Sequence, residues 1–203
     1  MTSPAVPSCR RTRPWPGSAA HYAAAMEATF TEPVNVLGMS TGGSIALQLA
    51  ADHSELIARP VLGGTACTLG PIGKRAQRAY IDRARRGQRP SPAPAELVTE
   101  SAIGRALVTT LGWVADGRKD HTDVATMRNA ADRYDLRGRL HDGKACTLLF
   151  QGAKDLVYPL EPARQTARAI LGARLISYPG RSHATTFTDK RFASDELTFL
   201  LDG

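Results

Sequence analysis

The segment Gly38-Met39-Ser40-Thr41-Gly42 carries the clearest chemical signal in the chain. A short apolar run, Val34–Leu37, precedes it, and a helix-forming run follows from 44 to 53, so Ser40 should lie on a sharp strand-to-helix turn. Such a turn holds a serine hydroxyl clear of the backbone and close to the amides that begin the helix. We expect Gly38 and Gly42 to be the small residues that let the strand and the helix pass closely. The pattern therefore predicts a nucleophilic serine at position 40.

Two further polar residues follow predicted strands. The apolar run 146–150 is typical of a strand buried on both faces of a parallel sheet, and it leads to Asp155. A second run, Arg174–Tyr178, breaks at a Pro-Gly pair and leads to His183. Because the carboxyl ends of parallel strands meet at one edge of a sheet, Ser40, Asp155 and His183 should converge. The alternatives are a plain turn or helix-cap role for Asp155 and a solvated loop position for His183.

In the order and local context of these three sites, the chain resembles the α/β-hydrolase superfamily, specifically its esterases, lactonases and cofactor-free haloperoxidases. The resemblance runs from about residue 19 to the end, and the motifs that carry it are Gly38–Gly43, Gly152–Asp155 and Gly180–His183. It implies that Ser40 is the nucleophile and His183 the general base and acid. It also implies that Asp155 orients the imidazole and that the Thr41 backbone amide supplies one oxyanion donor. No cofactor is implied.

The resemblance predicts a truncated α/β-hydrolase fold, in which a mostly parallel sheet is flanked by helices and carries a helical lid insertion. Residues 1–17 are rich in proline and arginine, and we expect this segment to be disordered. Residues 18–203 should form a single domain, with the lid at about 69–133. Within the lid the sequence predicts helices over 73–86, 96–114 and 122–133, with a linker at Pro90–Pro94 between the first two.

The chain departs from the family before Ser40. A complete α/β hydrolase has more strands there, and the loop after one of them supplies the second oxyanion donor, whereas this sequence has 39 residues and no His-Gly or Gly-Gly segment before Ser40. We therefore expect weakened activity, because one oxyanion donor contributes roughly a hundred- to a thousandfold in turnover. The strand Val34–Leu37 should then be a sheet edge that favours homo-oligomer formation.

Composition weakens several other interpretations. The net charge of +7 and an arginine-rich first lid helix raise the alternative of nucleic-acid binding, but no aromatic platform interleaves with the basic residues. The histidines and carboxylates lack metal-site spacing, so we expect no metal. The three cysteines, Cys9, Cys67 and Cys146, are odd in number and indicate reduced, buried thiols in a cytoplasmic protein. No apolar run is long enough to span a membrane, and the N-terminus has no signal peptide pattern.

The sequence thus predicts a serine hydrolase that acts on uncharged carboxylic esters or lactones through an acyl-enzyme at Ser40. The expected partners are a small-molecule substrate and a second copy of the chain, with no nucleic acid, membrane or cofactor. The alternative is a catalytically impaired hydrolase-fold remnant that acts through protein association.

Overall fold

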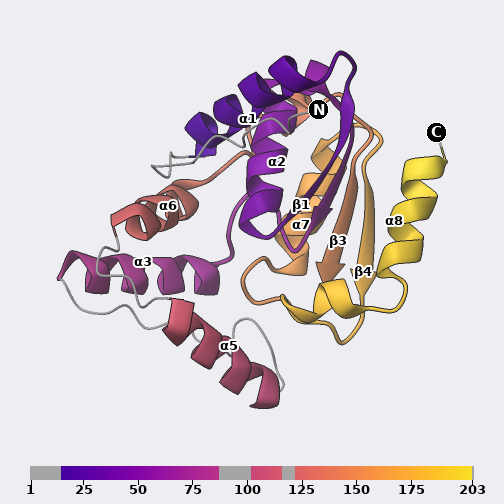
Figure 1. The fold of residues 1–203 in the computed structure, drawn as a ribbon. Coiled ribbons are helices and arrows are strands. Elements are labelled where there is room, and N and C mark those ends of the chain that lie inside the picture. The colour runs from indigo at the N-terminus through magenta and orange to yellow at the C-terminus, as the bar shows by residue number, and fades with distance from the viewer. Residues whose placement is uncertain (1–14, 87–101, 116–121, 203) are drawn as a thin grey trace, which may run out of the picture.

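The computed structural model describes residues 15–86, 102–115 and 122–202. A parallel sheet of four strands, in the order β1-β2-β3-β4, forms its centre (Figure 1). The strands are β1 (Val34–Met39), β2 (Ile57–Gly63), β3 (Leu148–Gly152) and β4 (Arg174–Tyr178). The helices against the sheet are α1 (Trp15–Thr29), α2 (Thr41–Asp52), α7 (Leu160–Ala169) and α8 (Phe192–Leu201). Between β2 and β3 the chain inserts α3 (Pro71–Arg85), α5 (Ala102–Ala115) and α6 (Thr122–Arg133). The fold is therefore the α/β architecture that the sequence predicts, with a helical insertion.

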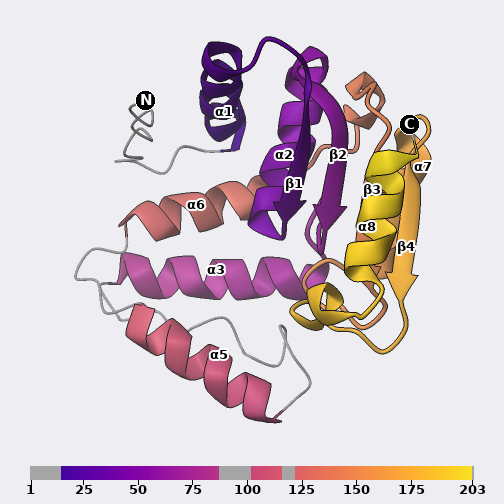
Figure 2. The ribbon, with the colours of Figure 1, turned by 45° about the vertical axis from the view of Figure 1, so that its right-hand side comes forward.

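The two faces of the sheet bury separate apolar clusters. On one face, α2 and α7 pack over Leu62 and Leu149, while on the other α8 packs Phe199 against Val61 and Phe150. Figure 2 shows the sheet between these two helical layers, with the inserted helices extending beyond the carboxyl ends of the strands. All five residues of β3 are buried, as expected for a central strand of a parallel sheet, although this strand lies two residues later than the predicted run.

Strand β2 was not expected from the sequence, because Pro60 and Arg59 interrupt its apolar pattern. Pro60 lies opposite Val36, beside an irregularity in the β1–β2 register. Pairing between β2 and β3 begins only at Val61. The proline therefore precedes the part of β2 that is central in the sheet, where its missing N–H would cost a ladder hydrogen bond.

One boundary differs from expectation. Helix α1 begins at Trp15, so it includes the last three residues of the segment expected to be disordered. Pro16 lies in the first turn, where the backbone N–H that proline lacks would have no acceptor within the helix. The lid helices α3 and α6 lie close to their predicted bounds, while the described part of α5 begins at Ala102. The predicted linker at Pro90–Pro94 lies outside the described residues.

Within the described part of the chain, β1 pairs with β2 alone and is an edge strand. Its residues alternate, with Val36 and Gly38 directed toward the helical core and Leu37 and Met39 on the opposite face. The exposed fractions of Leu37 and Met39 are 52% and 42%. An apolar strip therefore faces solvent at this end of the sheet.

The expectation of buried thiols holds for Cys67, which is fully buried, but it is wrong for Cys146, which is exposed. Cys146 lies two residues before β3 begins, outside the buried strand in which the sequence pattern placed it. Cys9 lies outside the described residues. None of the helices in the described ranges is long and apolar enough to cross a membrane.

Candidate active site

Ser40 occupies the turn between the end of β1 and the start of α2. Its backbone has φ 52° and ψ −119°, and it is the one residue other than glycine with a positive φ in the described part of the chain. A conformation of this kind costs on the order of 1–3 kcal/mol and persists only where the surrounding structure imposes it. Here the Ser40 N–H donates to the Gly63 carbonyl at 2.8 Å, and the Ser40 carbonyl accepts from the Ser44 N–H at 3.0 Å. The turn is therefore held by both β2 and α2.

Close packing around this turn depends on Gly38 and not on Gly42. A β-carbon at Gly38 would lie 2.7 Å from the Gly42 carbonyl oxygen and 2.9 Å from the Ala46 β-carbon. At Gly42 a β-carbon would meet nothing within 4 Å, so the expectation that Gly42 must be small is wrong. The second tight position is Gly43, where a β-carbon would lie 2.7 Å from the side chain of Thr65. The helix therefore approaches β1 at Gly38 and the chain after β2 at Gly43.

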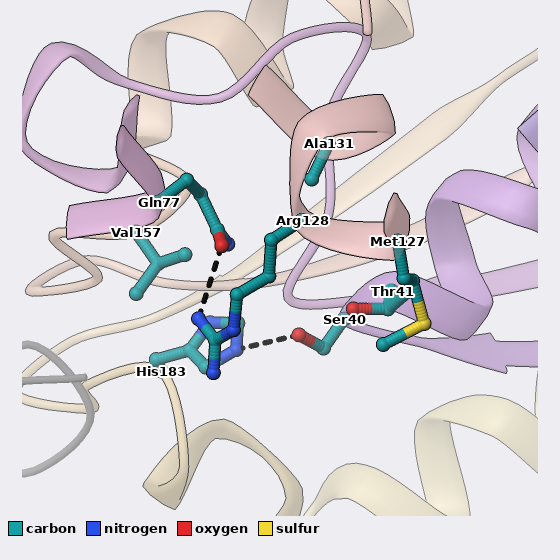
Figure 3. Close-up of a pocket in the computed structure, with 8 residues that line it drawn as sticks. All are labelled: Ser40, Thr41, Gln77, Met127, Arg128, Ala131, Val157 and His183. Carbon is teal, nitrogen blue, oxygen red and sulfur yellow. Dashed lines mark hydrogen bonds between the residues drawn. The ribbon is translucent and has the colours of Figure 1, made fainter. Parts of the chain in front are cut away.

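The three residues predicted to converge form one hydrogen-bonded chain. The hydroxyl of Ser40 lies 2.9 Å from Nε2 of His183, which Figure 3 shows directed at the serine. Nδ1 of the same ring lies 2.8 Å from Oδ2 of Asp155. With a proton on Nδ1 donated to the carboxylate, Nε2 can accept the serine proton. The exposed fractions of Asp155 and His183 are 3% and 8%, so the pair is shielded from solvent.

The alternative turn role of Asp155 is also present, on its other oxygen. Oδ1 accepts from the backbone N–H groups of Val157 and Tyr158 at 2.8 and 2.9 Å. Oδ2 accepts from Nε2 of Gln151 at 2.7 Å in addition to the His183 ring. One oxygen therefore orders the loop while the other faces the imidazole, and the carboxylate is held by charge-assisted bonds on both sides.

A buried hydroxyl network connects the loop that carries Asp155 to helix α2. The Tyr158 ring stacks on the His183 ring, with centroids 6.1 Å apart. Its hydroxyl lies 2.8 Å from the Ser44 hydroxyl, which lies 2.9 Å from that of Thr65. Burial raises the pKa of Tyr158 to about 12, so the phenol is neutral at physiological pH. Because Ser44 is on the first turns of α2, this network fixes the helix that carries Ser40 relative to the loop that carries Asp155.

A cavity of about 210 Å³ opens in front of the serine. The described residues that line it are Ser40, Thr41, Gln77, Met127, Arg128, Ala131, Val157 and His183 (Figure 3). Thr41, the predicted oxyanion donor, is the first residue of α2 and is among them. The backbone N–H groups of Ser40 and Val157 are already donated, to the Gly63 carbonyl and to Asp155.

Sequence reasoning missed several residues of the site. Gln77 and Arg128 enter the cavity from α3 and α6, and no spacing rule says which lid residues face inward. Gly64 follows β2 with φ 56°, and a β-carbon there would lie 3.3 Å from the His183 ring. The Gly63-Gly64 pair after the apolar Val61-Leu62 was the available signal for this close approach. Among the described residues there is no cluster of three or more potential metal ligands.

A strained serine between a parallel strand and a helix, hydrogen-bonded to a histidine from a later loop, is the arrangement of the α/β hydrolases. A model of the family described as Serine aminopeptidase, S33, matches residues 18–190. The chain belongs to this family of α/β-hydrolase enzymes. No curated protein matches the sequence significantly.

Solved structures with the same fold include three hydrolases. A hydrolase from Pseudomonas aeruginosa is 22% identical with a TM-score of 0.76, and the match covers 98% of this chain and 75% of that one. The enol-lactonase from Burkholderia xenovorans is 23% identical with a TM-score of 0.74, covering 97% and 76%. An esterase from Exiguobacterium antarcticum is 20% identical with a TM-score of 0.72, covering 93% and 74%. The likeness concerns the fold, and each of these chains is longer than this one.

Proposed function

We propose that the protein is a serine hydrolase that cleaves carboxylic esters or lactones through a covalent acyl-enzyme at Ser40. The observation that carries the proposal is the hydrogen-bonded chain from the strained Ser40 through His183 to Asp155, with distances of 2.9 and 2.8 Å. The esterase and the enol-lactonase with the same fold support this substrate class. Burial raises the pKa of the Cys67 thiol and so disfavours a thiolate nucleophile there.

In the proposed reaction, the Ser40 hydroxyl transfers its proton to Nε2 of His183 while its oxygen bonds to the substrate carbonyl carbon. Asp155 accepts the hydrogen bond from Nδ1–H of His183 and stabilises the imidazolium that forms. The carbon–oxygen bond to the alcohol then breaks, and His183 returns the proton to the leaving alkoxide. Water attacks the acyl-enzyme with His183 as base, and the carboxylic acid departs as the Ser40 hydroxyl is restored. For a lactone, the alcohol stays attached to the acyl group.

Low turnover is part of the proposal. The Thr41 amide is the oxyanion donor supported by its place at the start of α2 and in the cavity wall. We assign no second backbone amide to the oxyanion among the described residues of that wall, because the N–H groups of Ser40 and Val157 are donated to Gly63 and Asp155. Loss of one such donor costs about a hundred- to a thousandfold in turnover. We therefore expect measurable but slow hydrolysis.

Hydrolysis of a short-chain nitrophenyl ester and of a small lactone tests the proposal. The wild type should release product with a burst of nitrophenol when acylation outpaces deacylation. Ser40→Ala and His183→Ala should each abolish turnover, because both act directly on the reacting atoms. Turnover that persists in Ser40→Ala would contradict the proposal.

A second candidate function is association through β1, in a protein whose catalysis is impaired. The exposed Leu37 and Met39 on an edge strand favour it. Sedimentation should show a homodimer that Leu37→Lys disrupts. The control Leu171→Lys, at an exposed leucine just before β4 on the opposite edge of the sheet, should leave the homodimer intact. Val36 is unsuitable for this test because it packs into the core, so a charge there would unfold the edge. A monomeric wild type would contradict the association.

We also propose that the protein is cytoplasmic. Cys67 and Cys146 are both free thiols, and free thiols are the usual state in a reducing compartment. Subcellular fractionation of the tagged chain tests it, and recovery in an extracytoplasmic fraction would contradict it.

A further inference from the structure

Among the described residues, one permanently charged side chain lines the cavity in front of Ser40. Of the described residues that line it, Arg128 is the one that is charged at every physiological pH, and none is a carboxylate. Asp155 lies behind His183 and is almost fully buried, so its charge is engaged by the imidazole and the loop. The described cavity wall therefore places a guanidinium beside the serine.

Contacts across the two lid helices hold this guanidinium in place. The Arg128 carbon Cζ lies 3.8 Å from the centroid of the Tyr80 ring on α3, and Tyr80 is buried. Nη1 of Arg128 donates to Oε1 of Gln77, also on α3, at 3.0 Å. Stacking on a ring face fixes the plane of a guanidinium, and its donors lie in that plane. Figure 3 shows the side chain extending from α6 past Gln77 toward the space beside His183 and Ser40.

A second arginine on the same pair of helices has a different environment. Nε of Arg78, on α3, donates to both carboxylate oxygens of Asp132, on α6, at 3.0 Å. The Arg78 side chain is exposed and is not among the residues lining the cavity. Arg78 therefore joins α3 to α6 at the surface, whereas Arg128 joins them beside the serine. This contrast separates the packing contribution of an arginine from its contribution to the cavity.

We propose that the substrate is an anionic ester, whose acyl chain ends in a carboxylate that pairs with Arg128 while Ser40 attacks the ester carbonyl. This inference rests on the proposed ester hydrolysis. A guanidinium is suited to a carboxylate because two of its N–H groups can donate in parallel to the two oxygens. Met127, Ala131 and Val157 provide an apolar wall for a short carbon chain between the two polar ends. At about 210 Å³, the described cavity is smaller than sites for drug-sized ligands, so we assign a monoester of a short dicarboxylic acid.

Monomethyl glutarate and methyl pentanoate form the matched substrate pair, because they share a five-carbon acyl chain and differ in the terminal carboxylate. Proton release in a pH-stat measures hydrolysis of both. Wild-type protein should show the larger kcat/KM for monomethyl glutarate. In Arg128→Met, the ratio of the two kcat/KM values should fall by about 10- to 100-fold, the usual effect of one hydrogen-bonded charge pair. Arg78→Met, the matched control, should leave both the ratio and the activity as in the wild type.

The outcomes separate this inference from the proposed function. A ratio that is unchanged in Arg128→Met would overturn the carboxylate assignment and leave Arg128 a packing residue of the lid. A wild type that hydrolyses methyl pentanoate and not monomethyl glutarate would overturn the assignment while the proposed ester hydrolysis stands, and this comparison requires no variant to fold. Hydrolysis of neither ester would overturn both.

Discussion

Gly38→Ala and Gly42→Ala should have opposite effects, although the two glycines flank the serine symmetrically in sequence. At Gly38, the added methyl would lie 2.7 Å from the Gly42 carbonyl oxygen, 2.8 Å from the Gly43 α-carbon and 2.9 Å from the Ala46 β-carbon. Two of these atoms are backbone, so β1 and α2 must separate. Forced expansion of a packed contact of this kind costs about 1–3 kcal/mol. At Gly42 the methyl meets nothing within 4 Å, and alanine favours a helix by up to about 1 kcal/mol.

Thermal melting followed by circular dichroism measures both effects. For a chain of this size, about 1 kcal/mol corresponds to roughly 2–4 °C in Tm. The Tm of Gly38→Ala should therefore fall by about 2–12 °C, and that of Gly42→Ala should stay level or rise by up to about 4 °C. Equal losses in the two variants, or a larger loss in Gly42→Ala, would refute the assignment of the close contact to Gly38.

Three further predictions concern buried groups. Gln151→Leu removes one donor from Asp155 and should slow reaction at the serine by about tenfold or more, since a hydrogen bond to a charge contributes about 1.5–3 kcal/mol; an unchanged rate would contradict a positioning role. Iodoacetamide should modify the exposed Cys146 in the native protein and leave Cys67 unmodified, because burial raises the pKa of the Cys67 thiol. Mass spectrometry of the digested protein measures both; modification of Cys67 and not of Cys146 would contradict this prediction. Burial raises the pKa of Tyr158 to about 12, above the value of about 10 expected in the unfolded chain. The neutral phenol therefore contributes fully to stability below about pH 10, and this contribution is lost as the pH rises toward 12. The urea midpoint of unfolding should fall over this pH range, and it should fall less steeply in Tyr158→Phe.

The candidate site could be found from sequence because its three polar residues are each specified locally. Ser40, Asp155 and His183 follow strands whose apolar runs are readable, and the parallel arrangement brings the strand ends together. The second role of Asp155 in ordering its loop was readable as well, since aspartate commonly binds the backbone two residues on. Their catalytic roles remain a prediction until reactivity is measured.

Other features escaped sequence reasoning for physical reasons. Strand β2 contains a proline, which is tolerated because Pro60 precedes the segment paired with β3. Where that pairing begins depends on the tertiary structure and cannot be predicted from the local sequence. In the sequence, nothing distinguishes Arg128 from the other basic residues. Only the contact between α3 and α6 places its side chain at the cavity. Cys146 was assigned to a buried strand because the boundary was placed two residues early, within the usual error of such boundaries. Gly42 looked essential by motif, and only the packing distinguishes it from Gly38.

Site-resolved labelling with a fluorophosphonate tests the central claim most directly, because the probe reacts with a serine hydroxyl only when a base removes its proton. Mass spectrometry of the digested adduct should place the phosphonyl group on Ser40. Labelling should vanish in His183→Ala, since this imidazole lies 2.9 Å from the hydroxyl and is the proposed proton acceptor. Melting curves would show that both proteins are folded. Folded wild-type protein that takes up no phosphonyl group, or that carries it on a serine other than Ser40, would contradict the account.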